Sequence, residues 1–261
     1  MTARADDQGI GIVTPSHNQG AFIAETIDSV LGQQCPHLDY WVMDGGSTDN
    51  TVEVLKGYGA RIKWVSERDG GQAQAINKGL QRISSAGIIA FINSDDVYLP
   101  GAFEFVARYF QQHPEAAWLT GDHFIIDAEG RRIQGHVRAY KRMLQRHPVF
   151  RRLALANYIV QPSTFWRREL IEEVGPFDES LRYCFDYDFW MRAIQKHPLH
   201  VVDAPLSLFR IHGLSKGGSE FARQFEEEHK VLKRYTSSRT LLGLHRLHAR
   251  LIVFAYHALK R

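Results

Sequence analysis

Cysteine is scarce in this chain of 261 residues, which contains only Cys35 and Cys184. Two cysteines cannot form the disulfide framework of a small secreted domain or a structural zinc site. The first eight residues are polar and lack the apolar stretch of a secretory signal. We therefore expect a cytoplasmic protein whose thiols stay reduced.

Linkers and repeats are also missing. No Pro/Gly/Ser-rich segment interrupts the first 215 residues, and no fixed-period repeat or low-complexity tract is visible. With 44% hydrophobic and 23% charged residues, the chain can bury a large core. We expect one compact domain at residues 1–228 and a C-terminal helical appendage at residues 229–261.

Acidic residues are absent from two long stretches. Residues 130–168 contain ten Lys/Arg and residues 229–261 contain eight, so all 29 acids lie elsewhere. No helix-turn-helix, RNP or zinc-finger pattern accompanies these stretches, and we expect no nucleic-acid partner. Anionic lipid headgroups or a phosphate-bearing acceptor fit such basic patches better. A solvated basic face without a partner stays open as an alternative.

Paired carboxylates follow an apolar run in the middle of the chain. Residues 88–92 read Ile-Ile-Ala-Phe-Ile and are followed by Asn93-Ser94-Asp95-Asp96. Such a run indicates a buried parallel strand whose carboxyl end opens onto a ligand crevice. Mg²⁺ or Mn²⁺ held by one or two carboxylates and by substrate phosphates would suit this place. An Asp-rich turn is the alternative.

Two earlier segments share this design. Residues 39–44 form an apolar strand that ends at Asp44 and is followed by two glycines, and residues 9–13 form a strand that precedes Thr14. A helix beginning near Phe22 follows, with apolar residues at helical spacing. Three strands with polar, Gly-rich carboxyl ends, separated by helical stretches, predict a half-Rossmann nucleotide-binding sheet in an α/β protein.

The polar motifs, taken together, resemble a known family, the inverting family 2 glycosyltransferases with the GT-A fold. They occur in the family order between residues 9 and 215: Thr14-Pro15-Ser16-His17-Asn18, Asp44-Gly45-Gly46-Ser47-Thr48-Asp49, Glu67-Arg68-Asp69-Gly70-Gly71-Gln72, Asn77-Lys78-Gly79, Asn93-Ser94-Asp95-Asp96, Asp186-Tyr187-Asp188-Phe189-Trp190 and Phe209-Arg210-Ile211-His212. The resemblance implies a nucleotide-binding half within a mixed central sheet, an acceptor-binding part, and a nucleotide-diphosphate sugar as donor.

The resemblance also assigns a set of donor-binding residues. Asp44 would accept a hydrogen bond from the N–H of the nucleobase, although it could instead cap a helix. The full set expected to contact the nucleotide sugar is Thr14, Pro15, Ser16, Asp44, Asp69, Gly71, Gln72, Asn77, Asn93, Ser94 and Asp95.

Metal binding is expected at the motif that the family commonly writes Asp-x-Asp. Asn93 stands in its first acidic position and brings no charge, so metal binding should depend on Asp95 and Asp96. His212 lies where many relatives supply a histidine near the diphosphate or the metal, and it is otherwise a surface residue. The expected cofactor is Mn²⁺ or Mg²⁺.

The expected catalytic base lies in the segment Phe185-Asp186-Tyr187-Asp188. A carboxylate at the start of an amphipathic helix is well placed to deprotonate an acceptor hydroxyl. Relatives usually show Glu-Asp where this chain has Phe185-Asp186, so Asp186 inherits the role and Asp188 is the reserve candidate. Both carboxylates could instead only complement the helix dipole.

An acceptor pocket is expected beside the base, bordered by Asp122, Gln161 and Trp190. Trp190 would stack on a sugar, although it could equally be a core aromatic.

The C-terminal residues 241–259 combine an apolar stripe with basic side chains, which predicts a basic amphipathic helix. Its charges make it too polar to span a bilayer. Three locations remain open for the stripe: the inner face of an anionic membrane, a second protomer, or the protein's own domain.

These features predict an inverting, metal-dependent glycosyltransferase that acts on the hydroxyl of a glycan or lipid-linked acceptor. A catalytically silent nucleotide-sugar-binding or scaffold protein is the alternative, because Asn93 and Phe185 replace acids. A nucleotidyltransferase is less favoured, since residues 14–20 lack the Arg and Lys of a phosphate-binding loop.

Overall fold

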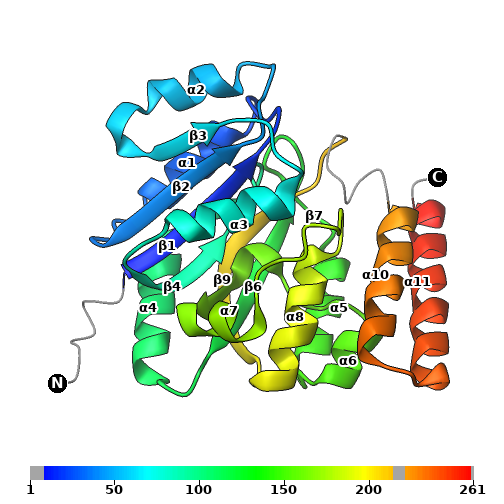
Figure 1. Ribbon diagram of the computed structural model, residues 1–261. Coiled ribbons are helices and arrows are strands. Elements are labelled where there is room, and N and C mark those ends of the chain that lie inside the picture. The colour runs from blue at the N-terminus through cyan, green and yellow to red at the C-terminus, as the bar shows by residue number, and fades with distance from the viewer. Residues whose placement is uncertain (1–8, 214–220, 260–261) are drawn as a thin grey trace.

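The computed structural model describes residues 9–213 and 221–259 (Figure 1). A mixed sheet has the strand order β3-β2-β1-β4-β8-β6-β9-β5, with β7 paired to β6. The first four strands in that order are parallel: β3 (Lys63–Ser66), β2 (Leu38–Asp44), β1 (Gly9–Ser16) and β4 (Ala86–Phe91). This unit confirms the predicted half-Rossmann sheet. Its four carboxyl ends lie along one edge, where ligands bind in sheets of this kind.

Helices connect the parallel strands. α1 (Ile23–Leu31) follows β1, α2 (Thr51–Gly57) and η2 (Gly59–Arg61) follow β2, and α3 (Gln72–Arg82) follows β3. The apolar face predicted for α1 is buried at Ile23, Ile27 and Val30. α3 lies very close to the sheet, because a Cβ on Gly79 would be 2.5 Å from Cγ1 of Val13. Glycine is therefore favoured where α3 crosses β1, because the two backbones approach closely there.

The second half of the chain adds antiparallel pairings. β8 (Thr164–Arg167) is antiparallel to β4 and to β6 (Trp118–Ile126), and β9 (His200–Arg210) is parallel to β6. β5 (Val97–Tyr98) pairs with β9, and β7 (Arg132–Ile133) with β6. The helices of this half are α4 (Ala102–Gln112), α5 (Gly135–Gln145), α6 (Phe150–Leu155), η3 (Gln161–Ser163), α7 (Arg168–Val174) and α8 (Phe185–Lys196).

An aromatic core joins the sheet to α8. Trp118 and Trp190 stack with ring centroids 5.5 Å apart, and Trp166 meets Trp190 edge to face at 5.7 Å. All three indoles are fully buried. Buried aromatic pairs of this kind contribute about 1 kcal/mol each beyond their area. They fix α8, whose first turn carries Asp186, against the sheet.

Two helices form the C-terminal end of the described chain. α10 (Phe221–Tyr235) packs on α8, and α11 (Arg239–Leu259) packs on α10 and α6 (Figure 1). The boundary expected between residues 228 and 229 falls inside α10. The division into a catalytic domain and a C-terminal appendage stays a prediction. None of the helices in the described part of the chain combines the length and apolar character that a bilayer crossing requires.

Candidate active site

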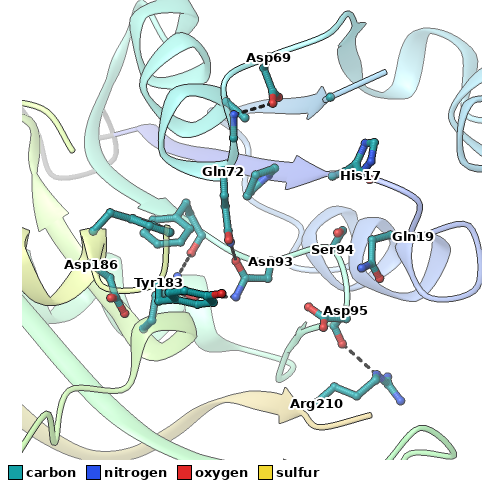
Figure 2. Close-up of a pocket in the computed structure, with 18 of the residues that line it drawn as sticks. His17, Gln19, Asp69, Gln72, Asn93, Ser94, Asp95, Tyr183, Asp186 and Arg210 are labelled. Carbon is teal, nitrogen blue, oxygen red and sulfur yellow. Dashed lines mark hydrogen bonds between the residues drawn. The ribbon is translucent and has the colours of Figure 1, made fainter. Parts of the chain in front are cut away.

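A cavity of about 560 Å³ opens at the carboxyl ends of β1 and β4 and at the N-termini of α3 and α8. Figure 2 shows its lining. Residues from six of the seven sequence motifs meet here. Four of these motifs follow the parallel strands, which end at the same edge of the sheet. The predicted site residues that line it are Pro15, Ser16, Asp69, Gly71, Gln72, Asn93, Ser94, Asp95, Gln161 and Asp186.

Asp69 and two glycines form one wall of the cavity. The Asp69 carboxylate accepts a hydrogen bond of 2.9 Å from the Gly71 N–H (Figure 2). Gly71 has φ of 123°, a conformation that L side chains rarely adopt. A Cβ on Gly45 would be 2.9 Å from Oδ2 of Asp69. Gly71 is therefore favoured by its backbone conformation, and Gly45 leaves room for the Asp69 carboxylate.

Asn93 is the centre of an amide network at the end of β4. Its Oδ1 accepts a hydrogen bond from Gln72 at 2.6 Å, and its Nδ2 donates to Gln161 Oε1 and to Asp96 Oδ2, each at 3.2 Å. Figure 2 shows the bond to Gln72. An aspartate at position 93 could not donate and would add a negative charge beside Asp96. The departure from the acidic motif therefore has a structural role here.

Asp95 and Asp96 point in different directions. Asp95 lines the cavity, and its Oδ2 lies 3.0 Å from Nε2 of His212. Asp96 is fully buried and accepts a 2.8 Å hydrogen bond from the Arg210 backbone N–H. Burial and the charge of Asp95 raise the pKa of Asp96 well above its usual value. Asp96 therefore faces the protein interior, and Asp95 faces the cavity.

A divalent cation fits the pair of Asp95 and His212. A carboxylate and an imidazole suit Mn²⁺, and such cations are often completed by waters and substrate phosphates. The described residues contain no cluster of three or more metal-ligating side chains. The protein would thus supply two ligands. Asp96, which is buried, would affect the cation only through Asp95.

Arg210 is a residue of the site that the sequence analysis did not single out. Its side chain is 2% exposed, and its Nε donates to the Asp95 backbone oxygen at 2.8 Å (Figure 2). Its Nη1 donates to the backbone oxygens of Asp127 and Ala128, each at 3.1 Å. Arg210 therefore fixes the turn that presents Asp95. Its place in the segment Phe209-Arg210-Ile211-His212 was the available signal in the sequence.

Asp186 lies in the first turn of α8 and lines the cavity. The chain just before it is held by Glu227 of α10, whose carboxylate accepts hydrogen bonds from the N–H groups of Arg182 (3.1 Å), Tyr183 (2.6 Å) and Cys184 (2.8 Å). These N–H groups belong to the N-cap residue Cys184 and to the two residues before it, so the Glu227 carboxylate fixes the backbone that leads into α8. α10 thereby positions the segment that carries Asp186.

Asp186 also has charged neighbours on two other helices. Burial and the charge of Asp186 raise the pKa of Glu228, on α10, to about 8. Burial lowers the pKa of Lys141, on α5, against the opposing influence of Asp186 and Glu228. Asp186 and Glu228 both interact with the charge of Lys141. The electrostatics around Asp186 therefore depend on residues of both α5 and α10.

Asp188 does not line the cavity. It is 3% exposed and is bound by Arg192 at 3.0 Å, Arg234 at 3.3 Å and the Tyr235 hydroxyl at 2.7 Å. Its carboxylate therefore joins α8 to α10, and the reserve base candidate is an anchor in this structure.

Three residues expected on the donor side also lie outside the cavity lining. Thr14 shares a 3.1 Å hydrogen bond with the Tyr40 hydroxyl. The Asp44 carboxylate accepts hydrogen bonds from Ser47 and, at 2.6 Å, from Ser66. The Asn77 amide holds the backbone of Phe177, donating at 2.9 Å and accepting at 3.0 Å. These three side chains bind other parts of the protein and do not line the cavity.

Two residues expected at the acceptor are likewise elsewhere. Trp190 is a core residue in the stack with Trp118. Asp122 is 3% exposed and forms ion pairs with Arg138 and Arg142 in a separate groove beside α5. Of the three acceptor candidates, only Gln161 lines the cavity. Lining residues that were not predicted include His17, Gln19, Tyr183, Phe185 and Gln224.

The comparison with protein families matches residues 11–175 to the family described as Glycosyl transferase family 2. An uncharacterized glycosyltransferase of Rickettsia felis is 26% identical over 85% of this chain and 37% of its own length. A PGL/p-HBAD biosynthesis glycosyltransferase of Mycobacterium bovis is 25% identical over 76% of each chain. The chain therefore spans little more than a third of the Rickettsia felis relative.

Two solved structures share the fold. S. aureus TarS 1-349 in complex with UDP-GlcNAc superposes with a TM-score of 0.67 at 18% identity, covering 86% of this chain and 65% of that one. The mannosyltransferase PcManGT from Pyrobaculum calidifontis, in complex with GDP-Man and Mn²⁺, gives a TM-score of 0.69 at 15% identity, covering 95% and 75%. These similarities confirm the predicted GT-A fold.

Proposed function

Because this chain belongs to glycosyl transferase family 2, we propose that it transfers a sugar from a nucleotide-diphosphate sugar to the hydroxyl of a glycan or lipid-linked acceptor, with inversion at the anomeric carbon. The observation that carries the proposal is the single cavity that Asp95 and Asp186 both line. Asp95 lies 3.0 Å from His212, with which it could share a cation, and Asp186 lies in the first turn of α8. In the view of Figure 2, Asn93 lies between them.

The donor side of the proposal depends on the ends of β1, β3 and β4. Pro15 and Ser16 would border the nucleotide, and Asp69 with Gly71 and Gln72 would close over it. Asp95 and His212 would hold Mn²⁺ or Mg²⁺, which supplies positive charge to the departing diphosphate when bound. Arg210 contributes by fixing the Asp95 backbone.

The acceptor side depends on α8. Inversion needs a base on the face of the sugar opposite the leaving group, and Asp186 would take the proton of the acceptor hydroxyl at its carboxylate. Glu227 would keep Asp186 at the distance from the donor that in-line attack requires. Tyr183 and Phe185, which also line the cavity, would border the acceptor sugar.

The cellular place of the reaction is proposed to be the cytoplasm. Both cysteines are free thiols in the structure, Cys184 buried and Cys35 half-buried, as expected for a reducing compartment.

A panel of nucleotide sugars tests the proposal. UDP-GlcNAc and GDP-Man come first, because similar solved structures contain them. A donor present at a hundred times its dissociation constant should stabilise the protein by about 2.7 kcal/mol with Mn²⁺. Transfer or donor hydrolysis should follow, and the product anomer, read by NMR, should be inverted.

The alternatives give different outcomes in the same assay. Donor binding without any turnover would indicate a silent binding or scaffold protein. Retention of the anomeric configuration would contradict the inverting mechanism, and release of pyrophosphate from a nucleoside triphosphate and a sugar phosphate would indicate a nucleotidyltransferase.

A further inference from the structure

Exposed apolar side chains are concentrated on α11. Six large apolar side chains are strongly exposed among the described residues, and four of them are Leu244 (50%), Leu247 (55%), Leu251 (58%) and Phe254 (73%). Their spacing of three, four and three residues aligns them along one face of the helix. We call these four residues the outer stripe. A stripe of this length is unusual on a surface that faces only water.

The opposite face of α11 is fixed to the protein. His245 is 1% exposed, its Nδ1 lies 3.2 Å from the backbone oxygen of Ala154 in α6, and its ring stacks on His229 of α10 at 5.4 Å. The Tyr140 hydroxyl lies 2.7 Å from Nε2 of His248, which ties α11 to α5. The outer stripe cannot turn inward without breaking these contacts. Packing against the chain's own described residues is therefore not its role.

A ridge of arginines runs beside the outer stripe. Arg239, Arg246 and Arg250 are exposed, and their spacing of seven and four residues places them on one line of the helix. Arg250 is one turn from both Leu247 and Phe254. No ion pair to Arg246 or Arg250 is found among the described residues, and residues 229–261 contain no acid. Apolar side chains next to unpaired cations characterise helices at membrane interfaces.

We propose that the outer stripe and its arginine ridge bind the surface of a bilayer that contains anionic lipids. The four apolar side chains enter the boundary between headgroups and acyl chains, and Arg239, Arg246 and Arg250 contact the headgroups. Charge complementarity selects this occupant over a second copy of the chain, since a contact between two α11 helices would bring arginine ridges together without an acid to pair with them. The inference does not depend on the proposed catalytic activity.

Sedimentation with lipid vesicles tests the inference on the full chain. The protein should sediment with vesicles that contain phosphatidylglycerol at low salt, bind much less to phosphatidylcholine alone, and be released at high salt as charges are screened. The double variant Leu247→Glu/Phe254→Glu should lower the partition coefficient at least tenfold. Arg246→Gln and Arg250→Gln should each lower it about fivefold, the factor expected for one basic side chain at such a surface.

A matched control uses exposed cations on a distant part of the fold. Lys56, in α2, and Arg61, in the η2 turn that follows it, are exposed. α2 lies far from α11 in Figure 1. The variant Lys56→Gln/Arg61→Gln removes the same charge and should bind vesicles as the wild type does. Equal loss in the control and in Arg246→Gln/Arg250→Gln would overturn the inference, because it would reflect net charge alone.

Two further measurements distinguish a bilayer from the protein's own interior and from a second copy of the chain as the partner of the outer stripe. The substituted side chains are exposed, so the melting temperature of every variant should stay within about 2 °C of the wild type. A large loss of stability in Leu247→Glu/Phe254→Glu would mean that the stripe is buried and would overturn the inference. A wild-type dimer that this variant converts to a monomer, together with no vesicle binding, would overturn it in favour of self-association.

Discussion

The Tyr235 hydroxyl donates a 2.7 Å hydrogen bond to Oδ1 of Asp188 and so joins α10 to α8. Asp188 is buried and also binds Arg192 and Arg234. Two residues earlier, Asp186 faces the cavity. Neighbouring carboxylates of one helix turn thus have different surroundings, and this difference separates the expected effects of their replacement.

Replacement of each carboxylate by its amide tests the assignment. Asp186→Asn should keep donor affinity and lower the transfer rate about 10²-fold or more, because only the base is removed. Asp188→Asn should instead lower the free energy of unfolding by about 2 kcal/mol, since it removes the buried charge that accepts hydrogen bonds from Arg192, Arg234 and Tyr235. Chemical denaturation and single-turnover kinetics measure the two effects. Wild-type turnover in Asp186→Asn would move the base elsewhere.

Metal dependence is expected to follow Asp95. Asp95→Asn should abolish the additional thermal stabilisation that Mn²⁺ gives to the donor complex, because the carboxylate beside His212 is lost. Asp96→Asn should mainly lower stability, since that carboxylate is buried. Glu104→Gln, at an exposed position of α4, is the matched control and should behave as the wild type. Full activity in excess EDTA would contradict the metal assignment.

Glu227 should affect catalysis without touching the donor. Glu227→Ala removes the acceptor of three backbone N–H groups before α8 and should lower kcat about tenfold or more through misplacement of Asp186. Glu227→Gln keeps an acceptor oxygen and should recover part of the loss. The adjacent Glu226 is exposed and has no such bonds, so Glu226→Ala should leave kcat unchanged. If both alanine variants lose activity equally, the positioning role is wrong.

The nucleotide-binding sheet could be predicted from the sequence because its signals are local. Continuous apolar runs ending in Asp44 and Asn93 mark buried parallel strands, and the sheet topology brings their ends together. The sequence could not show which of two adjacent carboxylates faces the ligand. Asp96 is turned inward by the Arg210 N–H, 114 positions away. That contact exists only in the folded chain.

The acceptor side was harder to predict for the same reason. Trp190 follows Asp186 by one helical turn, but the turn of α8 places Trp190 against Trp118 in the core. Asp122 was expected near the acceptor, and the arginines of α5 hold it in another groove. Glu227 lies more than forty positions beyond the segment that it holds. No local pattern identifies such a partner.

Gly79 provides a stability test of the contact between α3 and β1. A Cβ at this position would lie 2.5 Å from Cγ1 and 2.8 Å from Cγ2 of Val13. Overpacking of this kind costs about 1–3 kcal/mol, and the helix propensity of alanine offsets about 1 kcal/mol. Gly79→Ala should therefore destabilise by about 1 kcal/mol in urea unfolding. Gly57→Ala, with no atom within 4 Å of its Cβ, is the control and should be neutral or stabilising.

Acid should destabilise the protein through His123 on β6. The side chain is 2% exposed, and its Nδ1 has no hydrogen-bond partner among the described residues. Burial and the charges of Lys141 and Arg138 lower the pKa of His123 to about 3, against the opposing charge of Asp122. Between pH 6.5 and 3 the unfolded chain binds a proton at this histidine and the folded chain does not. Stability therefore falls as the pH is lowered through this window.

His123→Gln isolates that contribution, because glutamine does not titrate. The free energy of unfolding of the wild type should fall by about 2 kcal/mol more than that of the variant between pH 7 and pH 4.5. Urea unfolding at a series of pH values measures both slopes. Parallel curves for the wild type and His123→Gln would show that His123 is protonated in the folded protein, and the neutral buried histidine inferred from its surroundings would then be wrong.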